Sequence, residues 1–151
     1  MSTILSALQR FCAYRDRSRF ETSQKALKLG ANALEIEVLL QQLEKEGFLN
    51  DLRFAEAFCR GKLLQNGWGK WQILQGLDMH RLPKSTVQTA WEKIPRELYL
   101  SVLQKEALKK WGLLKGNTLE VRKQKLLRFL TGKGFETSLC LEVLDDLHLT
   151  E

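Results

Sequence analysis

Residues 44–73 read EKEGFLNDLRFAEAFCRGKLLQNGWGKWQI, and the local signals for helices and turns are clearest in this stretch. Gly47 suits the turn that ends one helix, and Asn50 followed by Asp51 suits the start of the next. From Asp51 onward, a period of about 3.6 residues gathers six apolar residues on one half of the helix. These are Leu52, Phe54, Ala55, Phe58, Cys59 and Leu63. We therefore predict a helix over residues 51–65 with one buried face.

A pair of helices around a turn recurs before, within and after this part of the chain. In each pair a short helix reaches a turn, and a second helix ends on an apolar residue 13 positions later. The turn and end residues are Gly30 and Leu43, Arg81 and Ile94, and Gly134 and Leu147. The turns are separated by 51 and then 53 residues, which indicates an internal repeat. Glycine readily closes a helix in the left-handed conformation, so Arg81 in that position predicts a different middle turn.

A further helix is expected ahead of each pair, at residues 4–14, 51–65 and 97–114. Leucine, lysine, glutamate and glutamine are common and only two prolines occur, which favours helices. Several helices show one apolar stripe at helical spacing. The stripes are Ile36, Leu39, Leu40 and Leu43; Leu100, Leu103, Ala107, Trp111 and Leu114; and Leu139, Cys140, Val143, Leu144 and Leu147. We interpret these stripes as core.

These patterns together predict an all-α fold. The expected organisation is three tandem three-helix repeats, at residues 1–50, 51–95 and 96–151. A unit of about 50 residues buries little surface alone, so neighbouring units should pack edge to edge. We therefore expect an elongated, curved array.

Composition argues against several classes of protein. Cys12, Cys59 and Cys140 are far apart, and the two histidines are far from any ligand cluster, which predicts reduced buried thiols and no metal site. No phosphate loop or activated nucleophile is recognisable, so we expect no catalytic residues, no cofactor and no enzymatic activity. No apolar run approaches the roughly 18 residues of a membrane span, and the N-terminus lacks a signal-peptide pattern. A cytoplasmic monomer is expected.

The formal net charge is +6, and it is unevenly distributed. Residues 51–96 contain eight basic and four acidic residues, and residues 97–133 contain nine basic and three acidic ones. Residues 134–151 contain five acidic residues and no basic one. Such a field favours an anionic partner, either a nucleic acid or an acidic protein. A solvated basic surface without a partner is the simpler alternative.

Three basic residues of the 51–65 helix are candidate contacts. Arg53 and Arg60 can address one anionic surface, or they can pair with Glu56 in water for roughly a few tenths of a kcal/mol. Lys62 falls within the apolar half near the helix end. It can extend outward past the last turn, or it can contact a partner.

The loop NGWGKW at residues 66–71 places two indole rings around a lysine. In a nucleic-acid interface, Trp68 would stack on a base beside Lys70. In the structural alternative, Trp68 and Trp71 pack the start of the next helix against the core. Two large apolar rings with a single lysine favour this packing.

The third repeat contains the largest concentration of basic residues. They are Lys105, Lys109, Lys110, Lys115, Arg122, Lys123, Lys125 and Arg128. If the second and third repeats stack, these side chains can form one continuous face, which is the best candidate for an electrostatic contact surface. The alternative is a set of solvated helix faces.

The segment from residue 47 to residue 76 resembles the second repeat of the RecX family. The matching residues are GFLND at 47–51, RFA at 53–55, Phe58 and Arg60, followed by GK at 61–62 and WG at 68–69. Upstream, YRDRS at 14–18 and QKAL at 24–27 are similar to the first repeat of that family. The third repeat is similar mainly in layout, so that the resemblance extends over nearly the whole chain.

The resemblance implies a regulator that binds the groove of the RecA filament on single-stranded DNA. Members of the family inhibit the ATP hydrolysis, strand exchange and co-protease activity of RecA by hindering filament growth and stability. Arg53, Arg60 and the basic residues after Ser101 are then the candidate contacts. Two alternatives stay open: a stand-alone DNA-binding helical protein, and a helical-repeat scaffold for another acidic protein.

Overall fold

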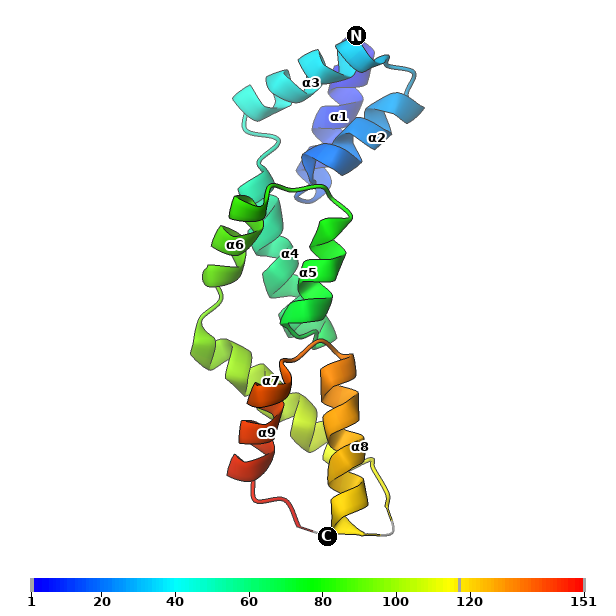
Figure 1. The fold of residues 1–151 in the computed structure, drawn as a ribbon. Coiled ribbons are helices and arrows are strands. Elements are labelled where there is room, and N and C mark those ends of the chain that lie inside the picture. Colours follow the sequence, from blue (N-terminus) through cyan, green and yellow to red (C-terminus); the bar gives the residue numbers. More distant parts are fainter. Residues whose placement is uncertain (1, 117, 151) are drawn as a thin grey trace. The chain divides into compact units, whose positions relative to one another are not determined.

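The computed structural model describes residues 2–116 and 118–150, and the regular structure in these ranges is entirely α-helical (Figure 1). The helices are α1 (Ser2–Tyr14), α2 (Arg19–Lys28), α3 (Ala33–Lys45), α4 (Asp51–Asn66), α5 (Lys70–Asp78), α6 (Lys84–Glu92), α7 (Arg96–Trp111), α8 (Leu119–Gly132) and α9 (Thr137–Asp146). The predicted all-α class is confirmed. Within the described ranges, no helix has the length and hydropathy needed to cross a bilayer.

The chain divides into two compact units. The N-terminal unit comprises the residues up to Phe58 together with Leu77–Trp91, and the C-terminal unit comprises Cys59–Gly76 together with the residues from Glu92 onward. Helices α4, α5 and α6 each contribute residues to both units. The boundaries of the three predicted repeats and their curved arrangement stay predictions.

Helices α1, α2 and α3 pack around one apolar cluster of the N-terminal unit. Its buried residues are Leu8, Cys12, Ala26, Ala31, Leu39, Leu40, Leu43 and Leu49. The predicted stripe on α3 is therefore confirmed, with Ile36 partly buried at its edge. Ser18 and Asn32 form capping boxes with Glu21 and Glu35, and these define where α2 and α3 begin.

Left-handed backbone occurs at all three predicted turn positions. Gly30 and Gly134 have a φ of 99°, and Arg81 has a φ of 54°. The middle turn is therefore also left-handed, but its φ differs from that of the two glycine turns. For a residue with a Cβ atom, this conformation is roughly 1–2 kcal/mol less stable than the right-handed one. The Arg81 guanidinium lies 4.5 Å from the centroid of the Phe20 ring, and this contact offsets part of that cost.

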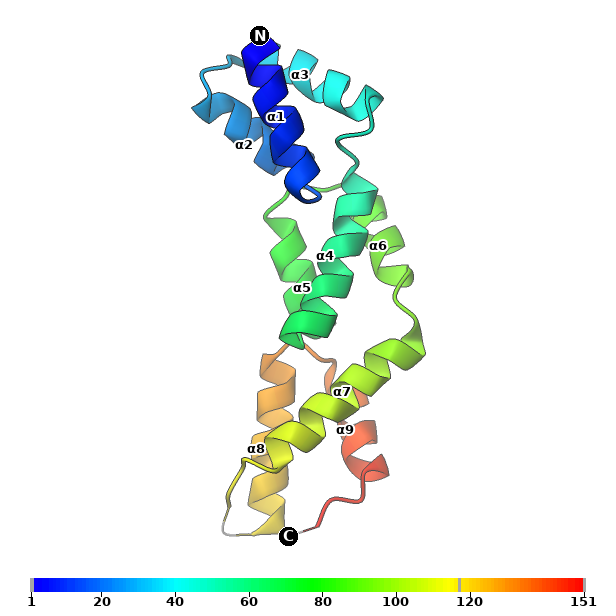
Figure 2. The same ribbon diagram turned by 180° about the vertical axis from the view of Figure 1, so that it is seen from behind.

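Helices α7, α8 and α9 pack on one another in the C-terminal unit (Figure 2). Their buried side chains are Tyr99, Leu103, Ala107, Trp111, Leu126, Leu130, Leu139, Cys140, Val143 and Leu144. Leu103, Ala107 and Trp111 of the predicted α7 stripe are buried, and Leu100 and Leu114 at its ends are half-buried. Tyr99 is a buried residue that the predicted stripe did not include. The Tyr99 hydroxyl donates to Glu136 and accepts the Lys70 backbone N–H at 3.0 Å, so the phenol is satisfied inside the core.

Two loops of the C-terminal unit, the one before α5 and the one after α8, are joined by backbone hydrogen bonds. The Gly69 N–H donates to the Lys133 carbonyl at 2.8 Å, and the Trp71 N–H donates to the Gly134 carbonyl at 2.9 Å. A Cβ atom at Gly69 would lie 2.2 Å from a backbone nitrogen of the facing loop, and one at Gly134 would lie 2.5 Å from the Gln72 nitrogen. Glycine at both positions therefore allows the two backbones to approach.

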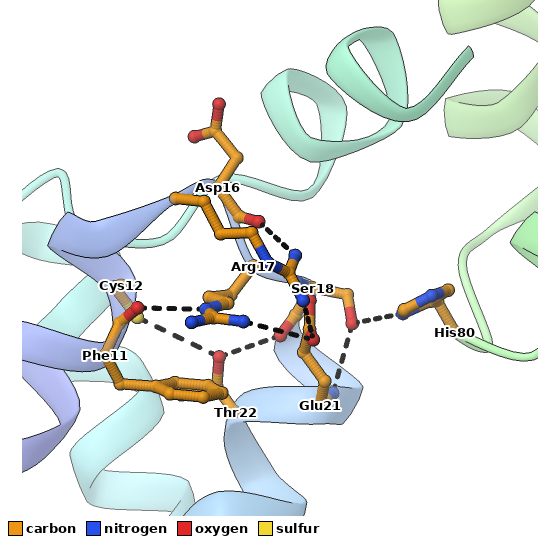
Figure 3. A network of polar contacts seen from close by, with 9 residues as sticks. Phe11, Cys12, Asp16, Arg17, Ser18, Glu21, Thr22 and His80 are labelled. Carbon is orange, nitrogen blue, oxygen red and sulfur yellow. Dashed lines mark hydrogen bonds and ion pairs between the residues drawn. The ribbon is translucent and has the colours of Figure 1, made fainter. Parts of the chain in front are cut away.

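A half-buried histidine joins the N-cap of α2 to the turn after α5 within the N-terminal unit (Figure 3). The His80 Nδ1 atom lies 2.6 Å from the Ser18 hydroxyl oxygen. The His80 ring also packs against Phe54 and Phe58, with centroid distances of 4.6 and 5.8 Å. The cluster therefore connects side chains from three elements that are distant in sequence.

Acidification is expected to destabilise the N-terminal unit through His80. Burial lowers the pKa of His80, while the nearby Glu21 carboxylate opposes the shift and Arg15 adds to it. Because the folded chain favours neutral imidazole, this contribution is present above the unfolded pKa, about 6.5, and is lost as pH falls below it. Thermal melts at about pH 7.5 and about pH 5.5 should show a larger loss for wild type than for His80→Gln. Equal losses in the two proteins would count against this role.

Candidate functional site

The C-terminal unit contains a groove formed by the end of α4, one face of α7 and the end of α8. Its volume is about 480 Å³. The described lining residues are Leu63, Leu64, Gln65, Asn66, Gly67, Val102, Lys105, Glu106, Lys109, Lys110, Leu113, Phe129 and Lys133. We call it the lysine groove, because three lysines of α7 and Lys133 from the turn after α8 converge on it.

The electrostatics of the lysine groove are strongly positive. Glu106 is the one acidic side chain among its described lining residues, and it is already paired with Lys133 at 3.2 Å. Lys133 also donates to the Asn66 carbonyl at 3.0 Å. Lys105 and Lys109, one turn apart on α7, are exposed to solvent. The charge of Lys133 is balanced by Glu106, whereas Lys105 and Lys109 add two positive charges to the groove lining.

The apolar part of the lysine groove is accessible. Leu64 and Leu113 are 47% and 71% exposed, and Val102 and Phe129 are half-buried lining residues. The Phe129 ring has the Lys110 ammonium 4.6 Å and the Lys133 ammonium 5.6 Å from its centroid. The groove therefore offers aliphatic surface and ammonium groups side by side.

The other basic candidates of the third repeat hold the connection between α7 and α8. The Arg122 guanidinium donates to the Trp111 carbonyl at 2.6 Å and lies 3.9 Å from the centroid of the Trp111 ring. Lys125 donates to the Lys115 carbonyl at 2.9 Å, and Lys123 is half-buried. Lysines 105, 109 and 110 thus line the groove, whereas Arg122, Lys123 and Lys125 are not among its described lining residues.

Arg53 forms an ion pair with Asp16, although its place in the sequence suggested Glu56 as a partner. Its Nε atom lies 2.6 Å from Asp16 Oδ1, and Glu56 is not its partner. Its two terminal nitrogens donate to the carbonyls of Gly47 and Phe48 at 3.2 and 3.3 Å. The side chain therefore satisfies carbonyls at the end of α3, where helix termini leave acceptors unpaired.

Arg53→Ala is expected to lower the free energy of unfolding by about 1 kcal/mol, because two carbonyls lose a charged donor and the ion pair is partly exposed. Arg60, which is exposed on the same helix, provides the matched control. Arg60→Ala should change that free energy by less than about 0.5 kcal/mol. Urea titrations of the two variants measure the difference in the free energy of unfolding. An equal loss in both variants would contradict a structural role for Arg53.

The tryptophan loop follows neither interpretation completely. Trp68 is half-buried, with the Lys62 ammonium 4.9 Å from its ring centroid. Trp71 is 57% exposed, with Lys70 5.3 Å from its ring centroid. The predicted packing of both indoles is therefore wrong for Trp71, which stays largely exposed while its backbone N–H donates to the Gly134 carbonyl of the facing loop.

The thiols agree with the prediction of buried, reduced cysteines. Cys12, Cys59 and Cys140 are buried and are not joined by disulfides. Burial raises the pKa of Cys12 and raises the pKa of Cys140 to about 11, with Glu136 adding to the latter shift. Thiols with such pKa values are poor nucleophiles near neutral pH. In the described ranges, no group of three His, Cys, Asp or Glu residues is arranged to hold a metal ion.

Short helices packed by apolar stripes, with an open basic and aliphatic groove, define an all-helical protein with a candidate binding surface. Residues 50–90 match the second three-helix domain of RecX, and residues 97–144 match the third. The regulatory protein RecX of Prosthecochloris aestuarii is 31% identical over 146 residues, which cover 93% of each chain. The chain belongs to the RecX family of regulatory proteins.

Other relatives and solved structures agree with this assignment. The regulatory protein RecX of Oceanobacillus iheyensis is 27% identical over 141 residues, and the chain spans about half of that relative, 52% of its length. The crystal structure of RecX from Lactobacillus salivarius has a TM-score of 0.88 at 19% identity, covering 99% of this chain and 97% of that one. A second crystal structure of regulatory protein RecX has a TM-score of 0.85 at 22% identity, covering 95% and 72%. These two structures are similar in fold.

Proposed function

We propose that the chain binds the RecA filament assembled on single-stranded DNA and inhibits its ATP hydrolysis, strand exchange and co-protease activity. The inhibition hinders filament growth or stability and needs no catalytic step by the chain itself, which acts as a cytoplasmic monomer. Membership of the RecX family supports the proposal. The observation that carries it is the lysine groove, a concave surface suited to an anionic partner.

The candidate contacts divide into two groups under this proposal. Lys105, Lys109 and Lys110 are the main contacts, because they converge on one concave surface. The remaining candidates, Arg53, Arg60, Lys62, Trp68, Lys70, Arg122, Lys123 and Lys125, are secondary. Several of these already make internal contacts: Arg53 and Arg122 bind backbone carbonyls, and Lys62 lies over Trp68. Within the filament, the exposed members of this group are also candidate contacts for single-stranded DNA.

A binding comparison tests the proposal against its two alternatives. Fluorescently labelled chain is titrated with RecA filaments preformed on single-stranded DNA with a slowly hydrolysed ATP analogue, and with the same DNA alone. We expect the filament to bind at least about tenfold more tightly, a difference of about 1.4 kcal/mol. Tighter binding to naked DNA, with a steep dependence on salt, would favour a stand-alone DNA-binding protein. Binding to neither would favour a scaffold for another protein.

A further inference from the structure

The chemistry of the lysine groove also indicates what kind of surface it accepts. Its volume, about 480 Å³, lies within the range of about 300–1,000 Å³ that is typical of ligand pockets, so it can accept a few side chains but not a whole domain. Leu64 and Leu113 leave aliphatic surface in contact with water at its edges. A partner that buries this surface must itself be apolar at those points.

The charges of the lysine groove select for anions. Lys105 and Lys109 stand at positions i and i+4 of α7, where two like charges repel each other and slightly destabilise the helix. Lys109 belongs to the last turn of α7, where a cation is favoured by the helix dipole, but Lys105 lies outside that turn. An anionic group between the two ammonium groups would remove their repulsion.

The apolar lining of the groove favours a protein segment over a single-stranded nucleic acid. Single-stranded nucleic acids bind through bases stacked on open aromatic faces. Phe129 is the one aromatic lining residue described, and two lysine ammonium groups already lie against its ring. The remaining apolar lining is aliphatic, which suits leucine-type side chains.

The shape of the groove is maintained by contacts that join its three walls. The ion pair between Glu106 and Lys133 connects α7 to the turn after α8, and Lys133 reaches the carbonyl of Asn66 at the end of α4. Gly67, with a φ of 64°, lies so close that a Cβ atom there would be 1.6 Å from a Glu106 carboxylate oxygen. The groove is therefore formed in the free chain, which lowers the entropic cost of binding.

We infer that the lysine groove binds an acidic protein segment that carries leucine-type side chains, with its carboxylates at Lys105 and Lys109 and its apolar residues against Leu64 and Leu113. This inference rests on the proposed function only in taking the lysine groove as the place where the chain meets its protein partner. Charge complementarity argues for the acidic segment, and the exposed aliphatic lining argues for its leucines.

The test uses the full chain and a fluorescein-labelled synthetic peptide in which leucine and glutamate residues are arranged on opposite faces of a helix. Two probes serve as comparisons: the same peptide with serine for leucine, and an oligothymidylate with a similar number of charges. We expect the leucine peptide to bind at least about tenfold more tightly than the serine peptide, and the oligothymidylate not to displace it. Displacement by the oligothymidylate, or equal binding of both peptides, would overturn the inference.

The site of binding is tested with paired variants. Lys105→Glu/Lys109→Glu should weaken binding of the leucine peptide by at least about tenfold, and Leu113→Asp should do the same through the apolar side. Lys84→Glu/Lys93→Glu makes the same change in net charge at exposed lysines outside the groove, and it should change binding by less than about twofold. Equal weakening by the two charge reversals would overturn the assignment to the groove.

Parallel titrations with RecA filaments distinguish the failure of this inference from the failure of the proposed function. If a groove variant no longer binds the peptide but still binds the filament as wild type does, the proposed function stands and the groove is not the regulatory contact. If wild type binds the peptide through the groove but does not bind the filament, the chemistry of the groove stands and the proposed function fails.

Discussion

Gly134→Ala is expected to lower the free energy of unfolding by about 4 kcal/mol or more, one of the largest effects that any single substitution in this chain should have. Two costs combine at this position. The φ of 99° is strained for any residue with a Cβ atom, and that Cβ would lie 2.5 Å from the Gln72 nitrogen and 2.8 Å from its Cβ atom. The loops could relieve the overlap only by losing the hydrogen bonds that Gly69 and Trp71 donate across them.

Gly30 provides a matched control for this prediction. It has the same φ of 99°, but a Cβ atom there would meet nothing within 4 Å. Gly30→Ala should therefore pay only the backbone cost, roughly 1–2 kcal/mol. Urea denaturation followed by far-ultraviolet circular dichroism measures both variants. If Gly134→Ala costs no more than Gly30→Ala, the close approach of the two loops is not a feature of the folded chain in solution.

The second large effect is expected in function. Lys105→Glu/Lys109→Glu should raise the concentration of chain needed for half-inhibition of the RecA ATPase by about 10- to 100-fold. The reversed charges would repel an anionic partner from the lysine groove, so that the partner would no longer bury the aliphatic lining. Both side chains are exposed, so the variant should keep its helical signal, and its melting temperature should fall only slightly through the loss of a favourable charge at the end of α7.

The control for the functional prediction is again Lys84→Glu/Lys93→Glu. Both double variants lower the formal net charge of +6 by four, so a general loss of electrostatic attraction would affect them equally. We expect the control to inhibit RecA within about threefold of wild type. Similar losses in both variants would show that the overall charge, not the lysine groove, determines inhibition.

Much of the fold follows from local patterns in the sequence. The stripe Leu39, Leu40 and Leu43 is buried as its spacing predicts, and left-handed turns occur at Gly30 and Gly134. Arg81 shows the limit of this reasoning. Its turn follows the repeat instead of its own preference, because a contact with Phe20, from a distant part of the sequence, offsets the backbone cost.

The candidate site could be predicted only in part. The lysines of α7 stand out in the sequence as a cluster, but the groove also needs Leu64 from α4 and Lys133 from beyond α8, and no local signal connects them. Arg53 and Arg122 show the opposite problem. Both were candidates because of their charge, yet both donate to backbone carbonyls within their own unit. Which arginine is engaged in this way depends on tertiary contacts that helical periodicity does not report.

The most direct measurement is the single-stranded-DNA-dependent ATP hydrolysis of RecA, titrated with this chain at well below one copy per RecA. The account predicts inhibition in that range, because a regulator that blocks growth or destabilises filaments acts on many RecA subunits at once. RecA from the same source as the chain should be used. The absence of inhibition even at equal amounts would contradict the proposed regulation of RecA.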